Sequence, residues 1–398
     1  MIGSRRYWQG WPALIGFVAA LFMPVVVADG VSVYLVGAGI NVMLGLLLVL
    51  FAVFAAIYPG ATVAGVIALL FGASAAAALA LWFLPEAVTA GTAAASLAQS
   101  DGSSKALARL AAAPGFWALA TVSWLLAWQL VTRLALAPTH NRTVAFILNI
   151  VVPLLFGAWL LFLWEILTRG FGVPFVILPS PSAIYAKIAV SIAILFADFQ
   201  QTVLKAVLAG YAMGCLAGFL VAIIADRFAF LKRGLVPVGN LVAALPIIGI
   251  APIMVMWFGF DWQSKAAVVA VMTFFPMLVN TLAGLGASEV MQQDLMRTYA
   301  ANHRQSLVKL RLPAALPFIF NALKINSTLA MIGAIVAEFF GTPVVGMGFR
   351  ISTEVGRLNI DMVWAEIAMA ALVGSAFYGV VTLIERVSTF WHPSFRQS

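Results

Sequence analysis

The chain has 398 residues, of which 64% are hydrophobic and only 9% are charged. A soluble domain carries about 25% charged residues, so a chain this apolar cannot cover itself with a wet surface. We therefore expect an all-α polytopic integral membrane protein. The formal net charge of +8 does not indicate a nucleic-acid partner, because the basic residues are scattered through short loops.

Long apolar runs divide the chain into candidate transmembrane helices, each close to the length of about 20 residues that crosses a bilayer core. The ten predicted spans are 11–28, 34–57, 61–83, 116–136, 144–167, 203–224, 234–258, 266–285, 315–339 and 362–384. The first run follows Arg5 and Arg6 and has some likeness to a secretory signal. Further spans follow it at once, which favours a first transmembrane helix; whether residues 1–28 are cleaved stays open.

The loops between these runs differ in positive charge. Every second loop is rich in arginine and lysine, and these loops hold 5–6, 133–142, 227–233, 297–311 and 386–396. Because cytoplasmic loops carry such an excess, we expect both termini to lie in the cytoplasm of a bacterium, with the chain in its inner membrane.

Two blocks follow from the same pattern. Residues 1–140 hold four spans with little polar chemistry, whereas residues 144–398 hold six spans and the long polar loops near 178–182, 286–313 and 341–361. A proline at 138 followed by polar residues marks the boundary, since proline interrupts a helix.

The most polar of these loops is 294–313, a basic stretch between the eighth and ninth predicted spans. Unpaired polar groups are costly in hydrocarbon, so this loop must lie in water or against a partner. Its residues also show a spacing: Asp294, then Ala300, then Leu310 with Leu312 and Pro313.

That spacing resembles the EAA loop in the membrane subunits of ABC importers, which reads Glu-Ala-Ala, three residues, Gly, nine residues, Ile, one residue, Leu-Pro. Here Leu295 and Met296 replace two alanines and Ala300 replaces the glycine. The segments 178–182, 244–259 and 337–348 resemble further parts of the subgroup that handles sulfonates, taurine, nitrate and a pyrimidine precursor of thiamine. The resemblance covers about the last 250 residues and gives the first block no counterpart.

The resemblance implies that the loop is a coupling helix that docks on a separate ATPase. The implied coupling residues are Asp294, Arg297, Tyr299, Ala300, Arg304, Leu307, Leu310, Leu312 and Pro313. Tyr299 and Leu307 would fill a pocket on the ATPase, and Leu312 with Pro313 would end the surface helix. The alternative is an amphipathic helix that lies on lipid headgroups.

It further implies a permease subunit of an ATP-driven importer that works by alternating access and is not itself an enzyme. The implied partners are ATPase subunits, a periplasmic substrate-binding protein and a second copy of this chain, because one chain carries one coupling loop. The sequence has no Walker loop, so ATP would be the cofactor of the ATPase, and no metal-binding or catalytic cluster stands out. The alternatives are an ion-coupled secondary transporter and a membrane receptor or scaffold.

Three glycines recur every four residues in the sixth predicted span: Gly210, Gly214 and Gly218. Small residues on one helix face let helices pack closely in lipid. Packing alone is the simpler interpretation, and a contact beside the transport path is the other.

A second set of residues is a candidate for the translocation path or its gate. Pro246 and Pro252 flank Gly249 and would break a span, which either exposes carbonyls to a cavity or only bends the helix. Asn280 and Asn326 either line a polar path or bond between helices. Glu338 lies at the end of a span, where we expect it to snorkel or to face an interface.

Overall fold

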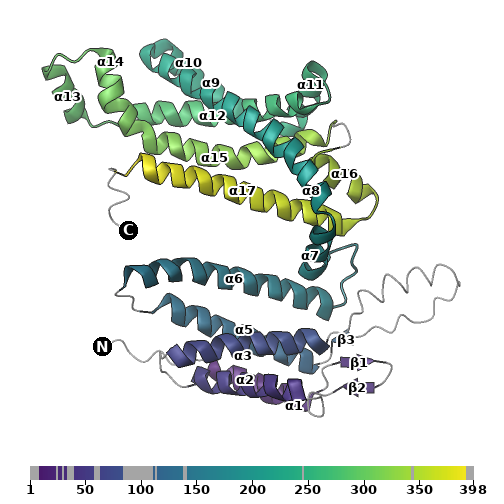
Figure 1. Cartoon of the computed structure of the whole chain (residues 1–398). Coiled ribbons are helices and arrows are strands. Elements are labelled where there is room, and N and C mark those ends of the chain that lie inside the picture. Colours follow the sequence, from purple (N-terminus) through teal and green to yellow (C-terminus); the bar gives the residue numbers. More distant parts are fainter. Residues whose placement is uncertain are drawn as a thin grey trace. The chain divides into compact units, whose positions relative to one another are not determined.

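The structure is a computed structural model that describes most of the chain (Figure 1). The described ranges are 9–23, 26–28, 31–33, 40–57, 63–83, 111–112, 114–137, 141–243, 246–341 and 345–390. Contacts divide the chain into two compact units, Met1–Ile184 and Tyr185–Ser398. This boundary at residues 184 and 185 differs from the predicted boundary near residue 140. It does not test which spans form the transport core, so the blocks 1–140 and 144–398 stay a prediction.

The first unit consists of helices around one apolar core. Its helices are α1 Gly10–Phe22, α2 Ile40–Ile57, α3 Val63–Phe83, α5 Pro114–Ala135 and α6 Arg142–Gly170. α5 packs against α1, α3 and α6, and it contributes the fully buried side chains of Phe116, Leu119 and Leu126. Three short strands, β1 Val26–Ala28, β2 Val31–Val33 and β3 Ala111–Ala112, form an antiparallel sheet in the order β2-β1-β3.

Polar side chains of α5 reach backbone carbonyls at the end of α2. Gln129 donates to the carbonyl of Ala56 at 2.8 Å, and Arg133 donates to the carbonyl of Ala55 at 2.9 Å. The last carbonyls of a helix lack partners within the helix, so these two side chains replace water there. Arg133 is only 5% exposed, although the sequence alone suggests a loop charge.

The end of the first predicted span, at residue 28, is wrong. α1 stops at Phe22, and Val26–Ala28 form β1 instead. Met23 has an extended backbone (φ −98°, ψ 148°) and precedes a proline, whose ring disfavours the helical conformation in the residue before it.

The second unit is a bundle whose central helix is α12. The helices of this unit are α8 Ile192–Phe199, α9 Leu208–Arg227, α10 Ala229–Ala243, α11 Ile247–Phe258, α12 Trp262–Leu285, α13 Val290–Thr298, α14 His303–Ser306, α15 Leu312–Glu338, α16 Met347–Gly356 and α17 Ile360–Ser388, while α7 Pro181–Val190 crosses the boundary between the units. π-helical turns at Gln200–Val207 and Leu307–Arg311 join α8 to α9 and α14 to α15. α12 packs against α9, α11 and α15, and α15 packs against α17.

The three glycines of α9 lie against α12. A Cβ atom on Gly214 would lie 2.1 Å from Thr273 Oγ1 and 2.4 Å from the carbonyl oxygen of Ala270, so only glycine fits this contact. Gly210 and Gly218 meet the same helix one turn to either side. The stripe therefore sets the close approach of α9 and α12.

The second unit has two distinct ends (Figure 1). α13, α14 and the C-terminal end of α17 lie at one end, and α11 and α16 lie at the other. α9, α12, α15 and α17 connect the two ends, so a loop between two of these helices lies at one end or the other.

The all-α polytopic architecture is confirmed. Among the described residues, six helices are long and apolar enough to cross a membrane, namely Pro114–Ala135, Arg142–Gly170, Ile192–Arg227, Trp262–Leu285, His303–Glu338 and Ile360–Ser388. Four shorter apolar helices, Gly10–Phe22, Val42–Ala56, Gly65–Leu79 and Ile247–Phe258, fall on the remaining predicted spans. The predicted span 234–258 consists of two helices, α10 and α11, instead of one continuous helix.

Candidate functional site

The polar loop between α12 and α15 presents an exposed helix, α13. Met291, Leu295 and Tyr299 lie four residues apart and are 81%, 57% and 78% exposed, so one face of this helix is apolar and uncovered within the unit. Asp294 and Arg297 form an ion pair at 3.1 Å on the surface of α13. A helix with such a face is suited to a groove on another protein.

A tight turn fixes the end of α13. Ala300 has a left-handed backbone (φ +51°), its N–H donates to the carbonyl of Arg297, and the N–H of Ala301 donates to the carbonyl of Met296. This pair of bonds is the Schellman motif, whose left-handed residue is usually glycine. Ala300 thus occupies a position where glycine would be less strained, which gives a physical reason for the glycine of the EAA pattern.

Asn302 starts the next helix with a capping box. Its side chain accepts from the N–H of Gln305 at 2.8 Å, and the side chain of Gln305 accepts from the N–H of Asn302 at 2.9 Å. From His303 the helix continues to Glu338 without an end.

The prediction that Leu312 and Pro313 end a surface helix is therefore wrong. Pro313 lies in the first turn of α15, directly after the π-helical turn Leu307–Arg311. A π-turn changes the backbone pairing by one residue, and it precedes a proline that has no N–H to donate. From His303 on, the loop thus continues into α15 as one helical rod.

The base of this rod is held by Arg311. Its guanidinium donates two bonds to the carboxylate of Asp226 at the end of α9, at 2.6 Å and 2.7 Å, and a third to the carbonyl of Leu285 at the end of α12. Asp226 is 3% exposed, so this pair is largely shielded from water. The sequence signals Arg311 only as a basic loop residue, because its partner lies 85 positions away.

The leucines of the loop are less available than Tyr299. Leu307 and Leu312 pack against an apolar cluster that includes Leu285 and Ala315, and Leu310 is half-buried. Arg304 is exposed. Of the two side chains that the sequence suggests as pocket fillers, Tyr299 is the one that points away from the protein's own core.

The opposite end of the unit contains a buried clasp, formed by Asp198, Thr202 and Glu338 with the first turn of α16. Asp198 accepts from the N–H of Gly346 at 2.6 Å, and Glu338 accepts from the N–H of Gly348 at 2.7 Å. Thr202 accepts from the N–H of Met347 and donates to Glu338 at 2.7 Å. Free N–H groups at a helix start are natural partners for carboxylates.

Arg350 completes the clasp by donating to Asp198 from Nε at 2.8 Å. This hydrogen bond raises the pKa of Arg350 above its usual value. Gly346 has a positive φ of 144°, and a Cβ atom there would lie 2.8 Å from the carboxyl group of Glu338. The expectation that Glu338 snorkels or faces an interface is wrong, because it is 2% exposed and its carboxylate is bonded inside the bundle.

A similar arrangement holds the first turn of α7, within the first unit. Glu165 accepts from the backbone N–H of Ser182 at 2.9 Å and from its hydroxyl at 2.7 Å, and it pairs with Arg169 at 2.5 Å. Ser182, the last residue of the segment 178–182, is thereby tied to the end of α6.

The two asparagines bond between or within helices. Asn326 is fully buried and donates from α15 to the carbonyl of Thr273 on α12 at 2.8 Å and to Cys215 Sγ on α9 at 3.2 Å. Asn280 donates to the carbonyl of Pro276 on its own helix and accepts from Asn321 at 3.4 Å. These contacts favour helix association over a path lining for both residues.

The break between α10 and α11 lies at Pro246. Pro246 is extended (ψ 122°) and precedes the first turn of α11, where the N–H of Gly249 donates back to the carbonyl of Pro246 at 2.9 Å. Pro252 lies inside α11. The residues Ala244 and Leu245 of the sequence motif lie outside the described residues.

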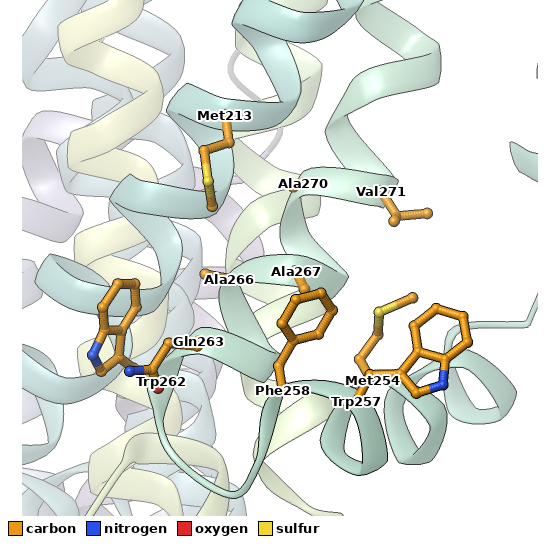
Figure 2. A pocket seen from close by; sticks show the side chains of 10 residues that line it. All are labelled: Met213, Met254, Trp257, Phe258, Trp262, Gln263, Ala266, Ala267, Ala270 and Val271. Atoms are coloured by element: carbon orange, nitrogen blue, oxygen red, sulfur yellow. The ribbon is translucent and has the colours of Figure 1, made fainter.

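Beside α11 an open cavity of about 500 Å³ lies between α9, α11 and α12 (Figure 2). We call it the aromatic groove, and it is lined by Met213, Met254, Trp257, Phe258, Trp262, Gln263, Ala266, Ala267, Ala270 and Val271. Asp261 starts α12 by accepting from the N–H of Trp262, and this bond, with one from Gln201, holds the pKa of Asp261 below its usual value. Among the described residues no group of three His, Cys, Asp or Glu side chains could hold a metal ion.

Comparison with known proteins places this geometry in a family. Residues 214–388 match the family described as "binding-protein-dependent transport system inner membrane component". The formylaminopyrimidine transport permease protein ThiX of Halalkalibacterium halodurans is 32% identical over 240 residues, which are 60% of this chain and 95% of ThiX. The chain belongs to this family of permeases.

Other relatives of this permease differ in the solute that their names give. The riboflavin transport system permease protein RibX of Chloroflexus aurantiacus is 29% identical over 59% of this chain and 88% of RibX. The putative aliphatic sulfonates transport permease protein SsuC of Bacillus subtilis is 29% identical over 61% of this chain and 88% of SsuC.

The protein is thus a multi-pass membrane permease subunit of the ABC importer type, of the subgroup that the sequence motifs indicate. The family implies an ATPase and a substrate-binding protein as partners. The clasp and the Arg311 pair were the features of this permease that sequence motifs did not reveal, because both join residues far apart in the chain.

Proposed function

We propose that this permease imports a small solute by alternating access, as a homodimer driven by separate ATPase subunits. The observation that carries the proposal is the uncovered apolar face of α13, with Tyr299 78% exposed at its end. ATP is hydrolysed on the partner, and this chain binds no cofactor of its own.

The loop has the properties of a mechanical connection. The Schellman turn at Ala300 and the capping box at Asn302 hold its shape by local bonds, so it is ordered before a partner binds. The helix from His303 to Glu338 is continuous, and its far end enters the clasp with α16. Movement of the loop would therefore be passed through α15 to the other end of the unit.

The docking partner is a protein groove and not the lipid surface. The apolar face of α13 is short, and its Asp294 pairs with Arg297 and so reduces the positive charge that an anionic lipid surface attracts. Family membership supports the same choice.

We place the α13–α14 end in the cytoplasm, because the loop is basic and belongs to the charge-rich set. The end with α11 and α16 then faces the periplasm and receives substrate from the binding protein. Both termini lie in the cytoplasm, and the spans of residues 1–140 face lipid and stabilise the assembly in the inner membrane.

Two classes of solute are compatible with the names of the relatives. ThiX and RibX are named for aromatic heterocycles, and SsuC is named for aliphatic sulfonates. The substrate of this permease belongs to one of these classes, a flat heterocycle or a small organic anion.

Replacing Tyr299 with alanine tests the docking proposal. Loss of a buried aromatic anchor costs about 2–4 kcal/mol of binding, so the affinity for the ATPase should fall about 30- to 1000-fold. The measurements are ATPase co-purification and ATP-driven uptake in reconstituted vesicles.

Tyr299→Phe is the matched control, since it keeps the ring and should retain most of the affinity. Full uptake and a normal ATPase complex with Tyr299→Ala would show that α13 is not the docking surface.

A further inference from the structure

Glu366 is a buried carboxyl group near the start of α17, beside the clasp. It is 0% exposed, and neither of its oxygens accepts a hydrogen bond from any residue that the structure describes. An ionised carboxylate without donors is costly away from water, so such a group is more stable with a proton bound. The clasp thus has beside it an acid that its hydrogen bonds do not use.

The partner of this acid is a second carboxyl group, that of Asp198. The two side chains lie within hydrogen-bonding reach of each other. Asp198 already accepts from the N–H of Gly346 at 2.6 Å and from Arg350 Nε at 2.8 Å, as an ionised carboxylate does. Two carboxyl groups can bond to each other only when one of them carries a proton, and two ionised ones repel each other. Glu366, which has no donor of its own, is therefore the group that carries the proton and donates to Asp198.

The charges around the pair lead to the same assignment. The charged groups of this cluster are Asp198 on α8, Lys265 on α12, Glu338 on α15, Arg350 and Glu354 on α16, and Glu366 on α17. Glu354 has a cation of its own, since it pairs with Arg357 at 3.1 Å, and Asp361 in the first turn of α17 pairs with Lys187 at 3.3 Å.

Three carboxyl groups and two cations are then left, namely Asp198, Glu338 and Glu366 with Lys265 and Arg350. Their charges balance when one of the three carboxyl groups is neutral. Glu338 is suited to the ionised form, because it accepts from the hydroxyl of Thr202 and from the N–H of Gly348, both at 2.7 Å. Glu366 is again the neutral member.

Arg350 connects this cluster with water. Its side chain is 20% exposed, whereas that of Asp198 is 0% exposed. Protons from the water at the α16 end of the unit therefore have only the Arg350 side chain to pass.

We propose that Glu366 and Asp198 share one buried proton, and that loss of this proton at alkaline pH loosens the clasp. An ionised Glu366 repels Asp198 and competes with it for Arg350, so the bonds that hold the first turn of α16 weaken. The clasp is thus a pH-sensitive latch. Its effect on transport rests on the proposed function, whereas the shared proton does not.

The sign of the pH dependence follows from the two states of the chain. A glutamate in the unfolded chain releases its proton near its ordinary pKa of about 4.3, while Glu366 keeps its proton in the folded chain. Since the folded chain then binds one proton more, its equilibrium constant for folding should fall by up to about tenfold for each pH unit, until Glu366 ionises. The thermal midpoint should therefore fall as the pH rises.

Glu366→Gln imitates the protonated acid, because its amide is uncharged and keeps a donor for Asp198. Infrared difference spectra of the full-length permease in lipid nanodiscs at neutral pH detect the C=O stretch of a protonated carboxylic acid, which we call the acid band. We expect an acid band in the wild type that Glu366→Gln lacks. We also expect the thermal midpoint of Glu366→Gln to fall less with rising pH than that of the wild type.

Glu385→Gln is the matched control. Glu385 is on the same helix, is 6% exposed and pairs with Lys324 at 2.8 Å, so it is ionised. Its replacement should leave the acid band in place.

The inference is overturned if wild type and Glu366→Gln have the same acid band, or if their thermal midpoints fall equally as the pH rises. If Glu366→Gln does not fold, the wild type alone still tests the inference. Its acid band must be present at neutral pH and must disappear at alkaline pH, and its absence at neutral pH overturns the shared proton.

ATP-driven uptake separates this inference from the proposed function. In vesicles with the ATPase and the binding protein, the wild type should import less solute per ATP as the pH on the side of the binding protein rises, and Glu366→Gln should not. An equal fall in both proteins would overturn the latch and leave the transport function intact. Vesicles in which the ATPase does not associate with the permease would instead overturn the proposed function, while the spectra would still report the shared proton.

Discussion

The two ends of the second unit are stabilised in opposite ways. At the α13–α14 end, exposed side chains are ordered by bonds between near neighbours, such as the Asp294–Arg297 pair and the Asn302–Gln305 box. At the α16 end, buried carboxylates accept from backbone N–H groups at the start of α16, and one of these bonds, from Gly346 to Asp198, joins residues 148 positions apart. One end is therefore shaped to meet a partner, and the other is locked into the bundle.

The largest loss of stability should come from a substitution that breaks the clasp. Asp198→Ala leaves the Arg350 guanidinium and the Gly346 N–H without their acceptor in a buried place, and removing one partner of such a pair costs about 3–5 kcal/mol. The measurement is the thermal midpoint of the detergent-solubilised permease.

The matched change at the other end is Asp294→Ala. The ion pair of Asp294 with Arg297 is exposed, since their side chains are 59% and 78% accessible. Its loss should therefore lower the free energy of unfolding by only about 0–1 kcal/mol. Equal losses of stability from the two variants would contradict the comparison between the ends.

A smaller loss of stability is expected from a change at Arg311, which follows the exposed loop in sequence but has a partner 85 positions away. Arg311→Lys keeps the charge but cannot make the bidentate bonds to Asp226 and the third bond to Leu285. We expect a loss of about 1.5–3 kcal/mol of stability and weaker coupling of ATP hydrolysis to uptake.

Arg297→Lys provides the control, because Arg297 makes one exposed ion pair within its own helix. If Arg311→Lys retained both the thermal midpoint and the uptake per ATP of the wild type, the rod would not depend on this anchor.

The connection between the ends depends on the contact of α9 with α12. Gly214→Ala puts a methyl group within 2.1 Å of Thr273 Oγ1, and overpacking of this kind costs about 1–3 kcal/mol. The comparison is with Gly234→Ala on α10, where a Cβ atom would meet nothing within 4 Å. Thermal midpoints of the two variants should differ clearly, and an unchanged Gly214→Ala variant would mean that α9 can move away from α12 at little cost.

Much of the fold could be predicted because it depends on local composition. The length and apolarity of runs such as 144–167 and 266–285 place α6 and α12 with small errors at their ends. The polar loop could be predicted because a segment between two spans that lies in water must be polar. The spacing of Asp294, Ala300 and Pro313 then indicated which kind of loop it is.

The remaining features depend on tertiary contacts. Glu338 accepts from the N–H of Gly348 and from the hydroxyl of Thr202, and an acidic residue at a helix end does not by itself predict such partners, so the sequence pattern alone favours snorkelling. The wrong prediction at Pro313 has a local cause, because the π-helical turn Leu307–Arg311 before it keeps the helix continuous and no sequence pattern indicates such a turn. Buried partners are hard to predict from local patterns when they are distant in sequence.

The smallest effect should come from the turn that follows α13. A left-handed backbone costs a residue with a side chain about 1–2 kcal/mol, and the greater freedom of unfolded glycine offsets about 0.5–1 kcal/mol of that. Ala300→Gly should therefore stabilise the loop by up to about 1 kcal/mol, without a change in the contacts of Tyr299.

Hydrogen exchange at the N–H of Ala301, which bonds to the carbonyl of Met296, measures this gain as slower exchange. Ala301→Gly is the control, since Ala301 does not have a positive φ and glycine there should only add freedom to the unfolded chain. Faster exchange in Ala300→Gly than in the wild type would mean that the turn is held by contacts other than its own backbone. The loop would then resemble the clasp, and the contrast between the two ends would not hold.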